Sequence, residues 1–237
     1  GQTIGTDGIN LTGTVTIGKY ATKSSGARVN TVERMDIDGV NKKMSGSITV
    51  SGTIDIQTGA EGNYGIVTEG TSYKRRYRKV AATWLEEDKI GRVDITSTGK
   101  INVNGNNSVG YILVQGEGSN AGNITVNAQN ALGFYGKTGK FENTGTINIS
   151  GDKSIGIGLL HNIQGVYAGG NIKIGTENPS SHAYANSGSD TGKVEEAVGV
   201  YAEVETRPVK KGELDDFAQM NSTNDIVGTD GINLTGT

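Results

Sequence analysis

The amino-acid sequence predicts an all-β fold, a right-handed parallel β-helix with three strands in each coil of about 23 residues. The first observation is a pair of β-branched residues with one residue between them, because apolar residues at i and i+2 form one face of a strand. The second is a glycine that stands two positions before each pair. Six such pairs occur: Val15/Ile17, Ile54/Ile56, Ile101/Val103, Ile124/Val126, Ile147/Ile149 and Ile172/Ile174.

The third observation is the spacing of these pairs in the middle of the chain. Ile101, Ile124 and Ile147 are each 23 residues apart, and the next pair follows after 25. A fixed period of about two dozen residues is typical of a solenoid in which each repeat is one turn. Left-handed hexapeptide helices have shorter coils, and the Leu/Asn signature of leucine-rich repeats is missing. We therefore favour the parallel β-helix, with the pairs stacked in one interior column.

Two further apolar positions predict the other strands of a coil. One lies six residues before a pair, at Ile9, Ile48, Ile95, Phe141 and Val166. The other is an apolar-Gly-apolar cluster after the pair, at residues 64–66, 109–111, 132–134, 155–157 and 198–200. Three short strands with tight corners enclose a triangular core, and we expect corner glycines to supply the positive φ that the bends need.

The residue inside each pair is expected to point outward, because side chains alternate along a strand. These residues are Thr16, Asp55, Asn102, Thr125, Asn148 and Lys173. Since the repeat runs from end to end, residues 1–237 are predicted to form one β-helix segment of a longer protein. Stretched spacings predict insertions at about residues 19–45, 68–91, 175–196 and 203–224.

The second insertion is expected to contain a helix over residues 73–89. Tyr77, Val80, Ala81, Trp84 and Leu85 fall on one stripe of such a helix. Its basic start and acidic end oppose the helix dipole, so packing against the flank of the β-helix must hold it. A shorter helix is predicted at 213–220.

Composition restricts the function classes. The net charge of −3 gives no support to a nucleic-acid or anionic-membrane partner. No apolar run has the length needed to span a bilayer. The chain has no cysteine, so it has neither disulfides nor a cysteine-based zinc site, and this composition fits a protein exported before it folds. No cofactor and no metal are expected.

Catalysis by a carbohydrate-active β-helix would need clustered carboxylates on adjacent coils. Asp55 is the only acid in its outward column, and Asp94 and Glu142 have a coil between them. His161 and His182 lie in loop-like stretches without a serine or aspartate at a suggestive spacing. No catalytic site is assembled by these residues, so we predict a protein that is not an enzyme.

The one strongly charged segment is basic and interleaved with aromatic residues. Such a segment can grip an acidic glycan, a nucleic acid or a partner protein, although its aromatic residues can equally pack inward. We expect a host or bacterial surface protein or glycan as its partner. The candidate binding residues are Lys74, Arg75, Arg76, Arg78 and Trp84.

The motif at 145–149 (Gly-Thr-Ile-Asn-Ile) followed by 153–157 (Lys-Ser-Ile-Gly-Ile) resembles the repeat of large fusobacterial-type autotransporter adhesins. Residues 99–103 and 107–111 repeat this motif pair. The resemblance covers the regular coils and not the insertions. It implies a type V secretion passenger, exported through an outer-membrane β-barrel and displayed as a β-helical stalk. No binding residues transfer, since such families carry function in variable excursions.

The resulting expectation is an extracellular adhesin or stalk segment on a bacterial cell surface, attached to the outer membrane through another part of the protein. The alternatives are a polysaccharide lyase or hydrolase and a self-assembling extracellular fibre subunit, because an uncapped solenoid end exposes strand edges. A longer repeat bears on the last alternative. Residues 4–14 return as 227–237, identical at ten of eleven positions and 223 residues later.

Overall fold

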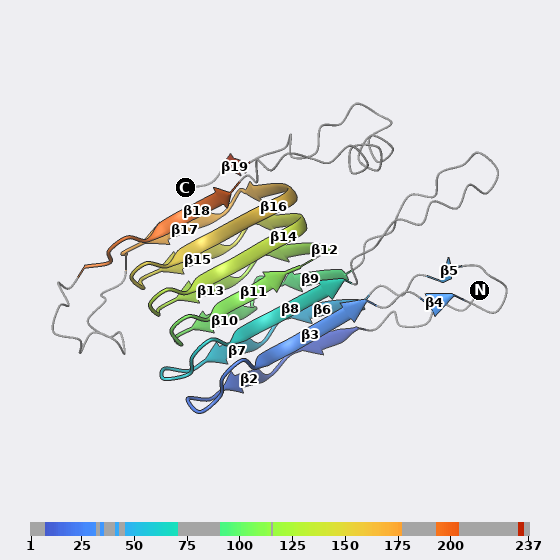
Figure 1. Cartoon of the computed structure of the whole chain (residues 1–237), viewed down its shortest axis with the longest axis horizontal. Helices are drawn as coiled ribbons and strands as arrows, with labels where there is room; N and C mark the ends of the chain where they lie inside the picture. Colours follow the sequence, from blue (N-terminus) through green and yellow to red (C-terminus); the bar gives the residue numbers. More distant parts are fainter. Residues whose placement is uncertain are drawn as a thin grey trace, which may run out of the picture.

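The computed structural model describes residues 8–31, 34–35, 41–42, 46–70, 91–114, 116–176, 193–203 and 232–234. Every element in these residues is a β-strand, and strands of successive coils pair in parallel (Figure 1). The predicted all-β class and the parallel three-strand coil are therefore confirmed. The two predicted helices, at 73–89 and 213–220, lie outside the described residues and stay predictions.

Strands at the first position of each coil form one column of parallel neighbours. From the N-terminal end this column contains β1 (Ile9–Leu11), β6 (Gly46–Val50), β9 (Gly91–Ile95), β12 (Gly116–Asn120), the second half of β14 (Leu132–Asn143), the second half of β16 (Ile155–Ala168) and β19 (Ile232–Leu234). The column thus begins a further coil, with β19, after the last complete one.

Strands at the second position form a six-stranded sheet. Its members are β2 (Thr14–Ile17), β7 (Thr53–Ile56), β10 (Lys100–Val103), β13 (Asn123–Val126), β15 (Thr146–Ile149) and β17 (Asn171–Ile174). The first residues of the apolar pairs face one another in register along the whole sheet, as predicted. Those of the middle coils, Ile54, Ile101, Ile124 and Ile147, are fully buried.

Strands at the third position are β3 (Ser25–Thr31), β8 (Tyr64–Gly70), β11 (Val109–Leu113), the first halves of β14 and β16, and β18 (Val198–Glu203). Both β14 and β16 continue without a break into the first position of the next coil. Two faces of the coil therefore belong to one 11-stranded sheet. A short antiparallel pair, β4 (Arg34–Met35) with β5 (Asn41–Lys42), lies between β3 and β6 along the chain.

One predicted alignment was wrong. Ile95 is buried, but it pairs with Val50, and Val93 takes the place opposite Ile48. The reason is a longer corner: six residues separate Ile95 from Ile101, whereas four separate Val50 from Ile54. The longer corner closes through a hydrogen bond from the Gly99 amide to the Thr96 carbonyl at 2.9 Å. A fixed offset from the pair therefore mislabels the first strand in this coil.

The reason predicted for the corner glycines was also wrong. None of the six glycines that precede second-position strands has a positive φ. A Cβ at Gly145 would instead lie 2.2 Å from the Gly122 carbonyl oxygen, and a Cβ at Gly122 would lie 2.1 Å from that of Gly99. Each glycine is required because the backbone of the preceding coil passes directly beside it.

Positive φ occurs at the next corner, between the second and third positions. The residues concerned are Lys23, Gly62, Asn107, Asn130, Lys153 and Glu196. Their amides extend the ladder between coils: Asn130 donates to the Asp152 carbonyl at 3.0 Å, and Lys153 donates to that of Glu195 at 2.9 Å. This inter-coil hydrogen bonding holds the left-handed conformation even where the residue is not glycine or asparagine.

Three aromatic side chains fill the middle of the core. Phe134 stacks on Phe141 with ring centroids 3.7 Å apart, and the edge of Tyr111 meets the Phe134 ring at 5.2 Å. Gly118 lies in register with Phe141, one coil earlier. A Cβ at Gly118 would come within 2.8 Å of the Tyr111 side chain. Tyr111 therefore occupies the interior volume that Gly118 leaves open.

The hydroxyl oxygen of Tyr111 is the one buried side-chain polar atom without a hydrogen-bond partner in the described part of the chain. The nearby Thr68 hydroxyl donates to the Ile112 carbonyl at 3.2 Å instead. Since an unpaired buried polar group costs about 1–3 kcal/mol, we expect Tyr111→Phe to stabilise the fold by about 1 kcal/mol. Urea unfolding at neutral pH measures this change, and a loss of stability would contradict it.

The same hydroxyl predicts sensitivity to alkali. Burial raises the pKa of Tyr111 above its ordinary value. Its contribution is therefore fully present below the unfolded pKa of about 10 and is lost as the pH rises above it. The advantage of Tyr111→Phe over the unchanged protein should accordingly grow between neutral pH and about pH 11.

Candidate interaction surfaces

The predicted basic binding residues lie in a segment whose attachment points are defined. Lys74, Arg75, Arg76, Arg78 and Trp84 all fall in residues 71–90, outside the described residues, so the structure neither places them nor brings them together. This segment joins the end of β8 to the start of β9. It leaves the coil at the corner between the third position and the next first position.

Two other long connections leave the β-helix at the same corner. Residues 32–45 join β3 to β6, and residues 204–231 join β18 to β19. The fourth connection, 175–197, differs because it joins β17 to β18, between the second and third positions. Three of the four long connections are therefore rooted along one edge of the solenoid, in successive or terminal coils.

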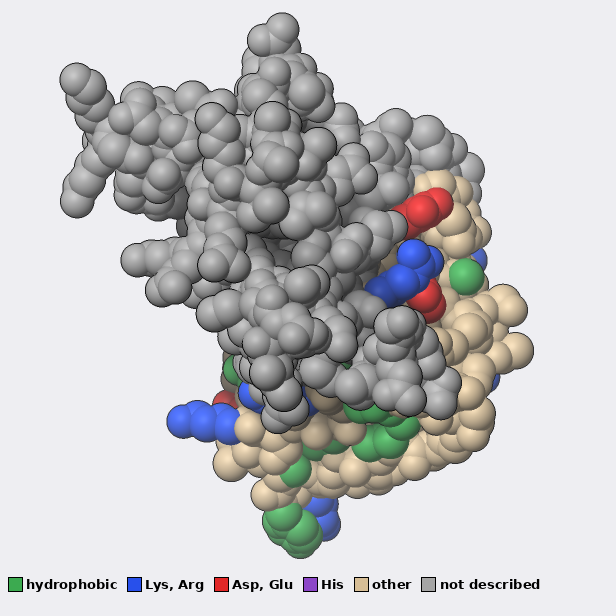
Figure 2. Space-filling view, turned by 90° about the vertical axis from the view of Figure 1, so that its right-hand side faces the viewer, with side chains coloured by type: hydrophobic (Ala, Val, Ile, Leu, Met, Phe, Trp, Pro, Cys, Tyr) green, Lys and Arg blue, Asp and Glu red, His purple; other side chains and the backbone are tan. Residues whose placement is uncertain are grey.

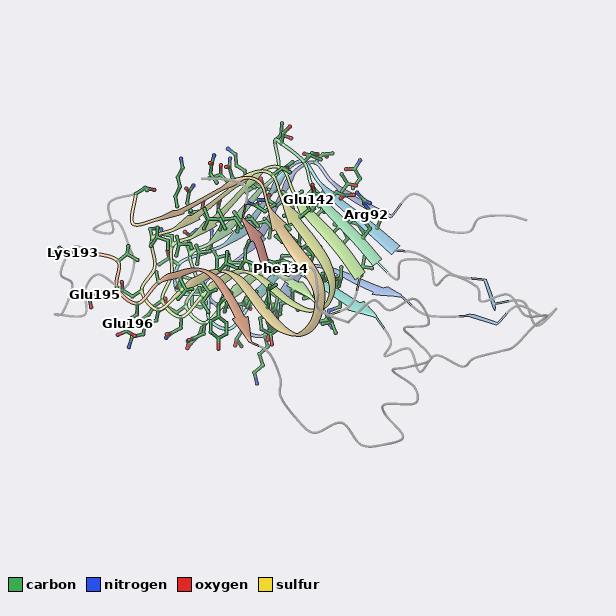
Figure 3. All side chains as sticks on the ribbon, turned by 90° about the horizontal axis from the view of Figure 1, so that it is seen from above. Arg92, Phe134, Glu142, Lys193, Glu195 and Glu196 are labelled. Carbon is green, nitrogen blue, oxygen red and sulfur yellow. The ribbon has the colours of Figure 1, made fainter. Side chains whose placement is uncertain are left out.

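The outer side of the first-position column contains the strongest polar cluster. Thr49, Asp94, Ser119 and Glu142 are consecutive neighbours in register. The Asp94 carboxylate accepts hydrogen bonds from Arg92 Nε and from Ser119 Oγ, each at 2.6 Å. Arg92 and Glu142 lie on the same side of the ribbon (Figure 3). As predicted, one coil, that of Ser119, separates the two acids.

The charge state of Asp94 follows from these contacts. Partial burial alone would raise its pKa, but the hydrogen bonds from Arg92 and Ser119 outweigh burial and hold the pKa below the ordinary value. The carboxylate is therefore ionised at neutral pH, which does not suit a general acid. Asp94 is held as an anionic hydrogen-bond acceptor between two donors.

We expect Ser119→Ala to move the pKa of Asp94 up toward its ordinary value of about 3.9, because one of the two donors is lost. Thr49→Ala, on the other side of Asp94 in the same column, is the matched control and should leave the pKa unchanged. A carbon NMR titration of the Asp94 carboxyl measures both. Equal shifts in the two variants would contradict the assigned role of Ser119.

The folded-state pKa of Asp94 also gives a sign for stability. Because it is lowered, the contribution is present above the unfolded value of about 3.9 and is lost as the pH falls through the folded value. Arg92 is 52% exposed, so solvent screens the pair. We expect Asp94→Asn to cost only about 0.5–1 kcal/mol at neutral pH, and less at acid pH.

The outward residues of the second-position sheet form a polar ladder. Asp55 accepts hydrogen bonds from Asn102 and Asn104, each at 3.3 Å. Asn104 in turn accepts one from Asn127 at 3.3 Å. Asp55 is thus occupied by amide donors, without a second acid beside it in its register column. This arrangement stabilises stacking and does not resemble a carboxylate pair.

Neither histidine joins a polar cluster in the part of the chain that is described. The backbone of His161 lies in β16, and His182 lies outside the described residues. No group of three potential metal-binding side chains occurs among the residues that could be searched.

Sequence reasoning missed an apolar outer surface on the third-position strands, here called the third-strand face. Leu132 and Ile155 are half-buried and lie opposite each other in register, outside the core cluster. The cause is a glycine bulge: Gly133 and Phe134 both face inward, so the first residue of each apolar-Gly-apolar cluster turns outward. The signal was present, since that first residue is apolar in five clusters.

The third-strand face contains two rows of apolar side chains. One row is Tyr64, Val109, Leu132, Ile155 and Val198, and the other includes Val67, Ile112, Tyr135 and Tyr201. At the C-terminal end Val198 is 37% exposed and Tyr201 is 43% exposed. Figure 2 looks onto the side on which β3 and β8 end, and shows hydrophobic side chains at the surface beside scattered charges.

No protein-family model, curated protein or solved structure matches this chain. In the described residues there is also no apolar helix of the length that crossing a membrane requires. The function is therefore argued from the geometry of the coils, the roots of the long connections and the exposed surfaces.

Proposed function

We propose that this chain is a non-catalytic, β-helical segment of a bacterial cell-surface protein, which presents its insertions to host or bacterial partners. The observation that carries the proposal is the common root of three long connections along one edge of a regular solenoid. Binding residues are often held on loops that a rigid scaffold positions. Insertions rooted in neighbouring coils can contact one partner together.

The coils are suited to act as a spacer. Parallel pairing joins each strand to the next coil, and six coils at the strand spacing extend for roughly 30 Å. Side-chain ladders such as Asp55–Asn104–Asn127 add contacts between neighbouring coils. In a solenoid each repeat is stabilised by its neighbours, so the stalk can be extended without a new core.

The cell-surface location rests on the resemblance of residues 145–157 to the repeats of large autotransporter adhesins, and on the lack of cysteine. The proposal places the chain outside the outer membrane, attached through another part of the protein. Protease treatment of intact cells, followed by detection with an antibody against the coils, tests it. Loss of the signal without lysis supports the proposal, and full protection contradicts it.

A charge-neutralised variant tests binding through the second insertion. Lys74, Arg75, Arg76 and Arg78 are replaced together by glutamine, and binding to host cells and to acidic glycans is measured. We expect a loss of about tenfold or more, which corresponds to about 1.4 kcal/mol. The matched control makes the same change of net charge on exposed residues of the coils: Lys19, Lys23, Lys100 and Lys173. Equal losses would indicate non-specific attraction.

The rival function is depolymerisation of an acidic polysaccharide. It is tested by incubating the chain with such polysaccharides and measuring new chain ends. Turnover that disappears in Asp94→Asn or Asp55→Asn, with the fold intact by circular dichroism, would replace the stalk proposal with an enzyme.

A further inference from the structure

We infer that the C-terminal coil of this β-helix receives the N-terminal coil of a second copy of the same chain, so that copies stack head to tail. The inference concerns the ends of the solenoid. It is independent of the proposed binding function, which depends on the insertions.

The first observation is that both ends of the first-position column have the same sequence. Residues 9–11 and 232–234 are both Ile-Asn-Leu, within a stretch identical at ten of eleven positions. β1 pairs with β6 at one end, and β19 pairs with β16 at the other, with equivalent residues in register. β19 therefore stands, relative to the last complete coil, where the β1 strand of a following copy would stand.

The second observation is that core side chains are left uncovered at the C-terminal end. Ile147 and Ile149 in β15 are 0% and 1% exposed, but Ile174 in β17 is 44% exposed. Ile172 is likewise only partly buried, although it lies in the same interior column as Ile147. No described strand pairs with the outer edge of β17. This end presents both apolar side chains and open backbone groups.

The N-terminal end has a matching surface. Val15 in β2 is partly exposed, whereas Ile54, its neighbour in register, is fully buried. Ile9 is 38% exposed. The outer edge of β2 has no paired strand among the described residues. Both ends thus lack one neighbouring coil of the same kind.

Continuation of the register makes the two ends complementary. If β2 of a second copy follows β17, Val15 lies on Ile172 and Ile17 lies on Ile174, as β-branched residues do at every other junction of this sheet. Outside the coil, Thr16 lies beside Lys173, so no like charges meet. Main-chain pairing between two such edges gives affinity, and the buried apolar pairs fix the register.

The third position is equally compatible. If β3 of the second copy follows β18, Ala27 lies on Val200 in the interior. On the outer surface Arg28 lies beside Tyr201, a cation that can pack on an aromatic ring. β1 of the second copy and β19 of the first then compete for one place with the same residues, so either strand completes the junction.

Engineered cysteines test this register directly, because the chain has none of its own. In Thr16→Cys/Lys173→Cys the two thiols face each other only across a head-to-tail junction. Within one copy they are five strand spacings apart, about 24 Å, whereas a disulfide needs Cα atoms within about 7 Å. Mild oxidation should therefore produce a ladder of covalent dimers and larger species on a non-reducing gel.

Three controls make the result decisive. Thr16→Cys/Thr125→Cys places the second thiol on β13, inside the stack, and should give no ladder. Thr16→Cys alone reports head-to-head contact. Ile174→Lys should weaken association about tenfold or more in sedimentation, because a charge is placed at the junction.

The outcomes separate cleanly. A ladder specific to the Thr16/Lys173 pair, with heavier species that grow with concentration in the unchanged chain, supports head-to-tail stacking. Monomers at every concentration, or equal cross-linking of both cysteine pairs, overturn it. Failure of the binding test on the insertions would leave this result untouched.

Discussion

Replacing Gly145 with alanine should destabilise the β-helix by about 3 kcal/mol, because a new methyl group would be forced into an already packed site. The Cβ would lie 2.2 Å from the carbonyl oxygen of Gly122 and 2.7 Å from the carbonyl carbon of Ala121. Both are backbone atoms of the preceding coil, so no side chain can rotate away. Relief requires that two coils move apart, which weakens the hydrogen bonds between β13 and β15.

Gly13 is the matched control for this substitution. It holds the equivalent position before β2, in the first coil, and no atom lies within 4 Å of where its Cβ would be. Gly13→Ala should therefore change stability by less than about 0.5 kcal/mol, as most exposed substitutions do. Urea unfolding followed by far-ultraviolet circular dichroism compares the two variants. Similar losses would show that the glycines serve local chain conformation and not the approach of the preceding coil.

These glycines also show where reasoning from the sequence stops. The pairs such as Ile124/Val126 determined the interior column correctly, because a period of two residues within a strand and 23 between strands leaves one way to stack them. The role of Gly145 was not readable in the same way. Whether a glycine is needed for its φ or for lack of a Cβ depends on the next coil, which the local sequence does not contain.

The surfaces were less predictable than the core for a related reason. The apolar-Gly-apolar clusters indicated a strand, but a glycine bulge turns Leu132 outward while Phe134 stays inside. Simple alternation cannot anticipate a bulge. The basic residues Lys74, Arg75 and Arg76 depart from the repeat, so the period that defines the coils gives no constraint on their position.

The core aromatic residues give the second large expected effect. Phe134→Ala should cost about 3–5 kcal/mol, because a fully buried ring is lost and the rigid strands on either side cannot collapse into the space. The position is in the middle of the stack, where β14 pairs with both β11 and β16. A cavity there weakens contacts on both sides, so the variant should unfold at a lower urea concentration.

A double-mutant cycle with Phe141 separates stacking from simple burial. Phe134 and Phe141 stack at 3.7 Å with an interplanar angle of 13°. If stacking contributes, Phe134→Ala/Phe141→Ala should cost less than the sum of the single changes by about 0.5–1.5 kcal/mol. Phe134→Ala with Ile54→Val, in a different coil, is the additive reference. Equal additivity in the two pairs would mean that each ring stabilises the coil independently, through its own buried surface.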